Sequence, residues 1–210
     1  MQKPAITSFI LKALLSLFSF SSFGQVSDST NWRLVHHENN IEVFTRESAN
    51  SALKEIRILC TVKSTMDHMV EFLSDVPLYT DWVYKCDSSV LQKEETPNEF
   101  TYYITLDFPF PMDNRDLIVH SEHSIDTITQ AYRSHSFTNT AMEYTNDEYI
   151  HITEFESTWT ISPAPVGMLT IDYQAFSDPG GEIPVWLVNL AIAKGPYETM
   201  KRFIELVEAE

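Results

Sequence analysis

Three of the seven histidines, His120, His123 and His151, lie in segments where apolar and polar residues alternate. Histidine titrates near neutral pH, so each could act as a general acid or base. His120 and Glu122 share one face of a predicted strand, and Arg115 lies on the other face. If Arg115 points inward, His120 and Glu122 point to solvent. His123 and His151 have inward parity and are expected on neighbouring strands. They either act as a general base, contact a ligand headgroup, or make ordinary buried hydrogen bonds.

The other reactive side chains indicate neither a metal site nor a covalent nucleophile. The sequence has no His-x-x-x-His or Cys-x-x-Cys spacing, so it predicts no zinc site. It has no Gly-x-Ser-x-Gly stretch, and its five glycines form no phosphate-binding loop. We therefore expect no metal and no cofactor, and no pattern here demands catalysis.

The charge balance excludes one class of partner. The 210 residues carry a formal net charge of −16. Nucleic-acid binding relies on clustered Lys and Arg, so no nucleic-acid partner is expected. Strong attraction to anionic lipid surfaces is disfavoured for the same reason.

The N-terminal residues 1–24 have the pattern of a cleaved secretory signal. Lys3 and Lys12 precede the acid-free run Ala13–Phe20, and small residues lead to a cut after Gly24. The apolar run is shorter than the about 20 residues that span a bilayer, which disfavours a permanent anchor. Removing residues 1–24 leaves 12 basic and 30 acidic side chains, a formal charge of −18. We expect an exported protein, periplasmic or secreted, with residues 25–210 as a single domain.

Strands must position most of the polar side chains. Period-two alternation of apolar residues is typical of a sheet with one buried face. The predicted strands are Trp32–His36, Ile41–Arg46, Leu53–Val62, Cys86–Lys93, Phe100–Phe108, Arg115–Ile125, Ala131–Thr138, Tyr149–Ile161 and Leu169–Ala175.

Two segments have helical spacing instead. Met66, Met69 and Leu73 follow the N-cap candidates at 64–65, and Pro77 ends that helix. The segment 182–210 is an amphipathic helix that Gly195-Pro196 must break or kink. An antiparallel sheet of about nine strands with a mid-chain helix and a long C-terminal helix predicts an α+β domain.

The two cysteines are expected to be free thiols. Cys60 shares a strand face with Ile56, Ile58 and Val62. Cys86 and Leu91 lie on opposite faces of another predicted strand. A disulfide between them is therefore disfavoured, although export would permit one.

Several stretches together resemble a known family. The segments "DWVYKCDSSVLQK", "NRDLIV", "STWTISP", "DYQAFSDPGGEIPVWLVN" and "GPYETMKRFIEL" are similar, in order and spacing, to the START lipid-transfer domains of the helix-grip (SRPBCC) group. The most specific features are Arg115-Asp116, Trp159 with Pro163, and the turn 178–181 ahead of Trp186. The resemblance covers roughly Trp32–Glu210.

The resemblance implies a helix-grip fold, in which a curved antiparallel sheet wraps the C-terminal helix around an apolar cavity for one lipid or sterol-like molecule. Strand alternation places these residues on the wall or lid: Tyr102, Ile104, Leu106, Phe155, Trp159, Ile171, Tyr173, Trp186 and Leu190. From periodicity alone, the same face could complete a filled core.

The resemblance also implies a polar anchor. In this family a carboxylate can pair with an arginine inside the cavity. The matching positions in this sequence are Asp87 and Arg115. Such a pair costs several kcal/mol per ion to desolvate, so it favours a ligand-binding role over a stabilising one. A structural or surface salt bridge is the alternative.

The loop "FPFPMDN", residues 108–114, matches the loop that borders the cavity mouth in this family. Phe108, Phe110 and Met112 are candidates for a gate or a transient membrane contact, which would depend on apolar contact because acidic side chains surround them. A plain turn is the alternative.

Three hypotheses follow: a non-enzymatic lipid carrier, a helix-grip enzyme of hydrolase or cyclase type acting in the same cavity, and a scaffold with a filled interior. The first is favoured, because no residue pattern requires catalysis.

Overall fold

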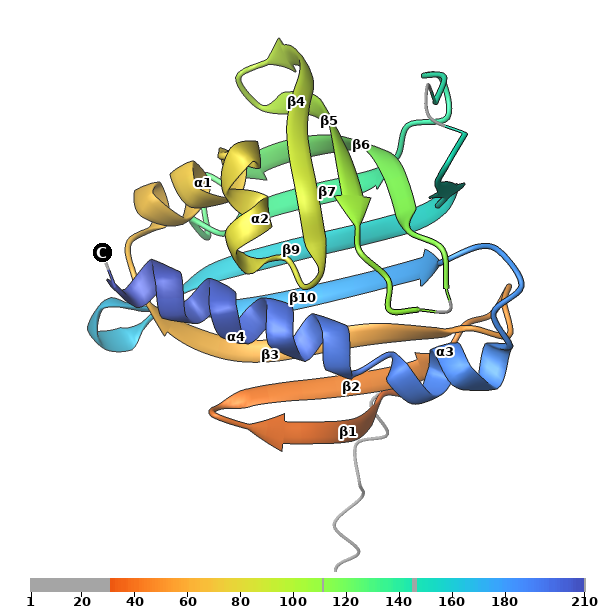
Figure 1. Ribbon diagram of the computed structural model, residues 1–210. Helices are drawn as coiled ribbons and strands as arrows, with labels where there is room; N and C mark the ends of the chain where they lie inside the picture. The colour runs from red at the N-terminus through yellow and green to blue at the C-terminus, as the bar shows by residue number, and fades with distance from the viewer. Residues whose placement is uncertain (1–30, 111, 145–146, 210) are drawn as a thin grey trace, which may run out of the picture.

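The computed structural model describes residues 31–110, 112–144 and 147–209, apart from the side chain of residue 190. The predicted signal sequence, 1–24, and the predicted contact of Leu190 therefore lie outside the described residues. The described chain forms one large curved sheet with helices packed inside its curve (Figure 1).

Ten strands of the described chain make up the sheet. They are β1 (Arg33–Glu38), β2 (Ile41–Glu47), β3 (Lys54–Lys63), β4 (Cys86–Thr96), β5 (Glu99–Leu106), β6 (Arg115–Ile125), β7 (Tyr132–Thr138), β8 (Ile150–His151), β9 (Glu154–Ala164) and β10 (Met168–Asp178). The order is β1-β2-β3-β10-β9-β7-β6-β5-β4, and β8 pairs with β6. The predicted α+β class is confirmed.

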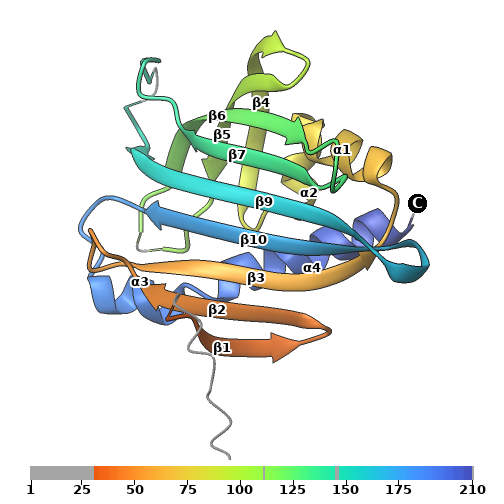
Figure 2. The same cartoon turned by 180° about the vertical axis from the view of Figure 1, so that it is seen from behind.

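The sheet closes through a long connection. After β3 the chain crosses to the far edge through α1 (Met66–Ser74), a 3-10 turn (Val76–Leu78) and α2 (Tyr79–Trp82). From β4 it returns strand by strand until β10 pairs antiparallel with β3. Figure 2 shows β3 and β10 side by side on the outer surface of the curved sheet.

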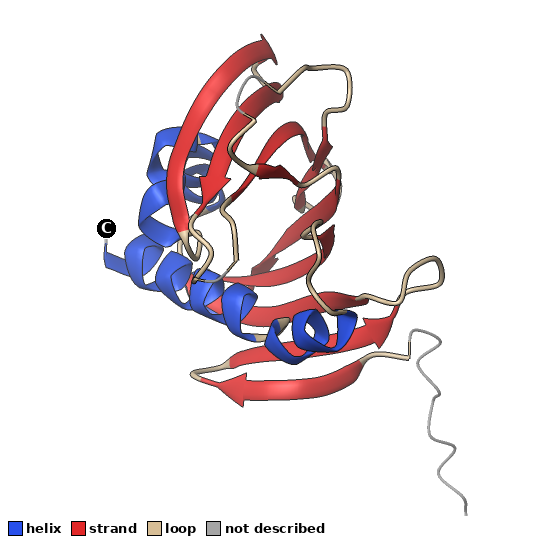
Figure 3. Ribbon diagram, turned by 45° about the vertical axis from the view of Figure 1, so that its right-hand side comes forward, coloured by secondary structure: helices blue, strands red, loops and turns tan. Residues whose placement is uncertain are grey.

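The predicted alternation separates an inner from an outer face. On β3, Ile56, Ile58, Cys60 and Val62 are buried. The long C-terminal helix α4 (Lys194–Ala209) lies across this inner face, and the strands curve round it (Figure 3). Phe203 of α4 is 0% exposed, and its ring lies 5.1 Å from the rings of both Trp82 and Trp159. Aromatic contacts therefore pack α4 against α2 and β9.

Both helical predictions are confirmed with one shift. Thr65 caps α1 by accepting a hydrogen bond from the His68 backbone N–H, and Pro77 follows the helix. The C-terminal segment divides into α3 (Val185–Ala191) and α4, so the break falls at residues 192–193, just before Gly195-Pro196. Pro196 sits in the first turn of α4, where a missing N–H removes no helical hydrogen bond. Among the described residues, no helix is long and apolar enough to cross a membrane.

The prediction of one strand over Tyr149–Ile161 is wrong. The chain forms the two-residue β8, parallel to β6, and then leaves the ladder before β9 begins at Glu154. Because Ile152 and Thr153 interrupt the strand, the parity counted along β9 does not carry back to His151.

Both cysteines are free, as predicted. Burial raises the pKa of Cys60 to about 12 and that of Cys86 to about 11. Both thiols therefore stay protonated at neutral pH and are poor nucleophiles.

Replacing Phe203 tests the packing beneath α4. Phe203→Ala should lower the free energy of unfolding by about 3–5 kcal/mol, because it leaves a cavity among aromatic rings. Urea denaturation measures the change. The control is Phe110→Ala, at a ring that is 97% exposed, and it should change stability by less than about 0.5 kcal/mol. Equal effects of the two changes would contradict the packing described.

Candidate functional site

The predicted wall residues gather on the inner face. Tyr102, Ile104, Trp159 and Ile171 belong to one buried apolar cluster, and Leu106, Phe155 and Tyr173 pack against it while keeping part of their surface accessible. Strands β5, β9 and β10 therefore bring together the seven side chains that the sequence placed there. Whether they contact a ligand stays a prediction.

Arg115 ties together two segments at one end of this face. Its side chain is buried and donates hydrogen bonds to the carbonyls of Asp113, Pro179 and Gly180. Its guanidinium also lies 4.5 Å from the centre of the Phe108 ring. One side chain thus joins the loop between β5 and β6 to the turn between β10 and α3. We call this arrangement the Arg115 clamp.

The turn fits the clamp only because it contains glycine. Gly181 has φ +71°, and a Cβ there would lie 2.9 Å from Ile150 Cδ1 and 3.3 Å from Arg115 Nη2. A side chain would therefore meet both a strained backbone and a close neighbour. The two glycines of the predicted turn allow β10 to approach β8 and Arg115.

The ion pair implied for Asp87 and Arg115 does not form between these two described residues. Asp87 is exposed on β4, next to a bulge between Cys86 and Ser88. Carbonyl oxygens occupy the guanidinium instead. Burial lowers the pKa of Arg115 below its usual value, and the Asp113 carboxylate opposes that shift. The buried arginine therefore holds backbone in place.

His151 lies on the outer face, which corrects its predicted inward position. Its Nδ1 is 2.6 Å from Oδ1 of Asp116, a carboxylate with 0% exposure that also accepts a hydrogen bond of 2.8 Å from the Tyr103 hydroxyl. The ring of Tyr144 stacks on His151 at 3.9 Å. Asp116 alternates with the inward Arg115, so the pair cannot reach the inner face. This cluster holds Tyr144 and His151 against the outer face of β6.

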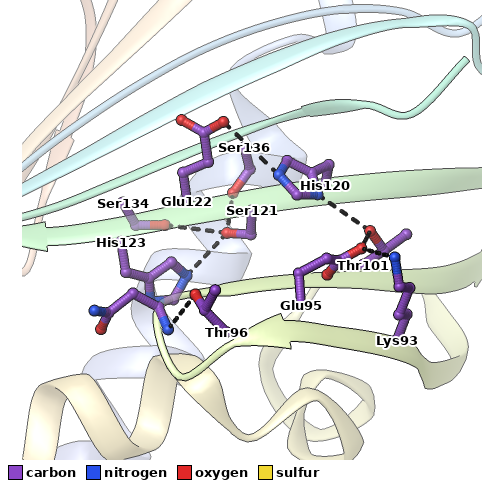
Figure 4. Close-up of polar contacts among 11 residues, drawn as sticks. Lys93, Glu95, Thr96, Thr101, His120, Ser121, Glu122, His123, Ser134 and Ser136 are labelled. Carbon is purple, nitrogen blue, oxygen red and sulfur yellow. Dashed lines mark hydrogen bonds and ion pairs between the residues drawn. The ribbon is translucent and has the colours of Figure 1, made fainter.

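His123 does point inward, into a cluster that sequence reasoning missed. Ser121 Oγ lies 2.9 Å from His123 Nε2, 2.8 Å from Ser136 Oγ and 3.4 Å from Ser134 Oγ (Figure 4). The Tyr132 hydroxyl is 2.6 Å from His123 Nδ1. We call these five residues the hydroxyl cluster. Strand parity with Leu117 and Val119 was the signal that could have revealed Ser121.

Figure 4 also shows the separate contacts of His120. Its Nδ1 is 3.1 Å from the Thr101 hydroxyl and its Nε2 is 3.7 Å from Glu122. His120 and Glu122 alternate with Ser121 and His123 along β6, as predicted for the outer face. No group of three or more His, Cys, Asp or Glu side chains in the described part of the chain could hold a metal ion.

The end of the inner face nearest the Arg115 clamp has an apolar rim. Trp186 of α3 is 68% exposed and Val185 is 42% exposed. Phe110 in the loop after β5 is 97% exposed, whereas Phe108 and Met112 are half-buried. Surface hollows lie elsewhere, beside the 138–144 segment and on the outer face over β3, β9 and β10.

Removing the clamp should loosen both segments that it joins. In Arg115→Leu, amide hydrogen exchange over residues 107–114 and 178–184 should be faster by roughly tenfold, as expected for losing hydrogen bonds from a charged donor. Amides of β9 should not change. Arg133→Leu, at an exposed arginine, is the control. Exchange that rises in only one of the two segments would contradict a shared clamp.

The amino-acid sequence was compared with family models and with known proteins. No family model matches the chain. An uncharacterised protein of Pseudomonas aeruginosa is 26% identical over 176 residues, which are 81% of this chain and 84% of that protein. The human phosphatidylcholine transfer protein is 24% identical over 171 residues, 79% of this chain and 78% of its own length.

The fold comparison agrees with the sequence relatives. The crystal structure of a STAR-related lipid transfer protein from Xanthomonas axonopodis superimposes with a TM-score of 0.78 and 26% identity, covering 84% of this chain and 98% of that one. Its fold is the one that the quoted stretches implied, and START-like folds support lipid binding. The inner apolar wall, the Arg115 clamp and the two C-terminal helices are thus parts of a fold that this chain shares with a STAR-related lipid transfer protein.

Proposed function

We propose that the protein holds one lipid or other apolar ligand between its sheet and its C-terminal helices, and carries it between membranes without covalent chemistry. The observation that carries the proposal is the exposed apolar rim of Trp186, Val185 and Phe110. This rim lies at the end of the inner face where Leu106 and Phe155 are only half-buried. Large exposed apolar side chains that gather in one place indicate a contact surface.

The inner face has the chemistry to hold an acyl chain or ring system. Its wall combines aromatic and aliphatic side chains from β5, β9 and β10. Each buried methylene contributes about 0.8 kcal/mol, so a chain of ordinary length binds without any covalent step. Tyr173 illustrates the environment, because burial raises its pKa to about 12 although part of its surface stays accessible.

Uptake requires the rim to move. α3 is separated from α4 by residues 192–193, and its exposed side chains leave few apolar contacts to break. The side chain of Asn189 ties α3 to the backbone of Ala52 and Lys54, and the Arg115 clamp holds the turn before it. We infer that α3 and the loop 107–114 open together to admit the ligand.

The named relatives support a carrier. The Xanthomonas protein is called a lipid transfer protein, and the human relative a phosphatidylcholine transfer protein. Each aligns over most of this chain, 84% for the Xanthomonas protein and 79% for the human one. Lipid transfer is therefore the activity we propose here.

An enzyme of hydrolase or cyclase type is the second candidate, favoured by the contact of Ser121 with His123. Two features oppose it. Ser121 is only 2% exposed and shares its hydroxyl with two further serines. Burial lowers the pKa of His123 to about 4, so the imidazole is a weak base at neutral pH.

Native mass spectrometry tests the carrier and its proposed export together. Protein recovered from the cell envelope or medium of an expressing bacterium should have the mass of residues 25–210 plus about one lipid. Ala175→Trp, which adds bulk on the half-buried inner face of β10, should reduce the lipid-bound fraction by roughly tenfold. Gln174→Trp on the opposite face of the same strand is the matched control.

Several results would count against these proposals. Wild-type protein that stays empty after both cellular expression and incubation with vesicles would exclude the carrier. An intact residue 1–24 segment on envelope or medium protein would exclude a cleaved signal. Turnover of esters or polyketide mimics that disappears in Ser121→Ala would favour the enzyme.

The rim should decide how fast a ligand is exchanged. Phe110→Ser combined with Trp186→Ser should slow lipid transfer between zwitterionic vesicles by roughly tenfold, because the apolar contact with the membrane is lost. Fluorescent-lipid transfer assays measure the rate. Ile128→Ser, at a 91% exposed residue in the turn after the opposite end of β6, should have no effect. Equal slowing by Ile128→Ser would exclude a specific rim.

Anionic vesicles should exchange lipid with the protein more slowly than zwitterionic vesicles, because the chain has a net charge of −16.

A further inference from the structure

The middle of the inner face has a row of small side chains. Ser121 on β6, Ser136 on β7 and Ser157 on β9 stand opposite one another in register, and Ala175 of β10 continues the row. The three serines are between 2% and 6% exposed. Buried hydroxyls in an apolar core are costly unless they are hydrogen-bonded, so three in one row need an explanation beyond packing.

The row and its neighbours form a polar but uncharged surface. Ser121 contacts Ser134, Ser136 and His123, and His123 contacts the Tyr132 hydroxyl. His123 has hydroxyl partners on both ring nitrogens and is neutral at physiological pH, because burial lowers its pKa to about 4. Each hydroxyl can both donate and accept, so the cluster can present either role to a ligand.

A second observation points to a ligand. Tyr102 is 8% exposed, yet its hydroxyl forms no hydrogen bond with any described residue. Its ring lies 6.0 Å from Phe100, whose ring lies 4.8 Å from His123 and which stands opposite Ser121 in register. On α2, Nε1 of Trp82 is a buried donor that has no partner among the described residues.

No free charge faces this surface in the described part of the chain. Arg115 is the cation on the inner face of β6, and its guanidinium is occupied by three carbonyls. Lys54, at the edge beneath α3, is paired with Glu47 at 3.2 Å. A phosphate group brought to the serine row would therefore be desolvated without a counter-charge, which costs several kcal/mol.

We infer that the hydroxyl cluster, together with Tyr102, is the headgroup site of the carrier and selects a neutral lipid with a free hydroxyl, such as a sterol or a diacylglycerol, over a phospholipid. The inference rests on the proposed carrier function. The ligand hydroxyl would accept from Tyr102 and donate to a serine or tyrosine oxygen, which would give the unpartnered donor its hydrogen bond. The apolar remainder would lie along the wall toward the rim.

A competition experiment tests the ligand class. The protein is incubated with vesicles of phosphatidylcholine that contain equal small amounts of dioleoylglycerol, cholesterol and phosphatidylglycerol, and the bound lipid is identified by native mass spectrometry. We expect cholesterol or dioleoylglycerol to be bound, although phosphatidylcholine is in large excess. The methyl ether of the bound lipid, which cannot donate, should bind more weakly by roughly 3- to 10-fold.

Adjacent tyrosines on β5 provide a matched pair of variants. Tyr102→Phe should weaken binding of the hydroxylated lipid and of its methyl ether alike, each by roughly 3- to 10-fold, because the oxygen of either ligand accepts from Tyr102. Tyr103→Phe removes a hydroxyl from the outer face, where it bonds Asp116, and should leave ligand preference unchanged. Ser121→Ala should act in the same direction as Tyr102→Phe. Thermal melting of each variant verifies that it is folded.

The outcomes separate this inference from the carrier function. A stoichiometric phospholipid would overturn the inferred ligand class and leave the carrier in place. A neutral lipid whose affinity is the same in wild type, Tyr102→Phe and Ser121→Ala would overturn the assignment of the headgroup site. Binding of no lipid at all would overturn both proposals.

Discussion

The structure depends on covering one apolar face of a strongly curved sheet. Inner-face residues of β3, β5, β9 and β10 are buried together with residues of α1, α2 and α4, which shield them from water. Phe203 meets Trp82 and Trp159 at the centre of this contact. Burial of aromatic surface of this size dominates the energetics of a core. The pairing of β10 with β3 closes the sheet around the helix and makes that burial possible.

Arg115 and Asp116 show how two adjacent residues on a strand serve opposite faces. Arg115 is buried on the inner face and binds the backbone of the turn before α3 and of the loop before β6. Asp116 is buried on the outer face and binds Tyr103 and His151. Because successive side chains on a strand alternate, the pair anchors both sides of β6 at the same position. The motif therefore organises the rim from both faces of the sheet.

The polar groups of the interior differ from those of the surface in charge. The surface is acidic overall, with a chain net charge of −16, whereas the hydroxyl cluster contains serine, tyrosine and a neutral histidine. A neutral polar site in an apolar interior can bind a hydroxyl group without desolvating an ion. The same physical difference argues against acid–base catalysis by His123, whose pKa burial lowers to about 4.

The amino-acid sequence by itself determined the α+β class, the inner faces of the long strands, the helix α1 with its Thr65 cap, and the free state of the cysteines. These features follow from periodicity and local capping, which act over a few residues. Only the tertiary structure decided the partners of Arg115, the outward position of His151 and the meeting of three serines. Side chains from distant strands meet through sheet order and register, and a two-residue interruption after β8 changes parity without a sequence signal. Local pattern therefore predicted which face each strand buries, while long-range pairing decided which polar groups lie together on it.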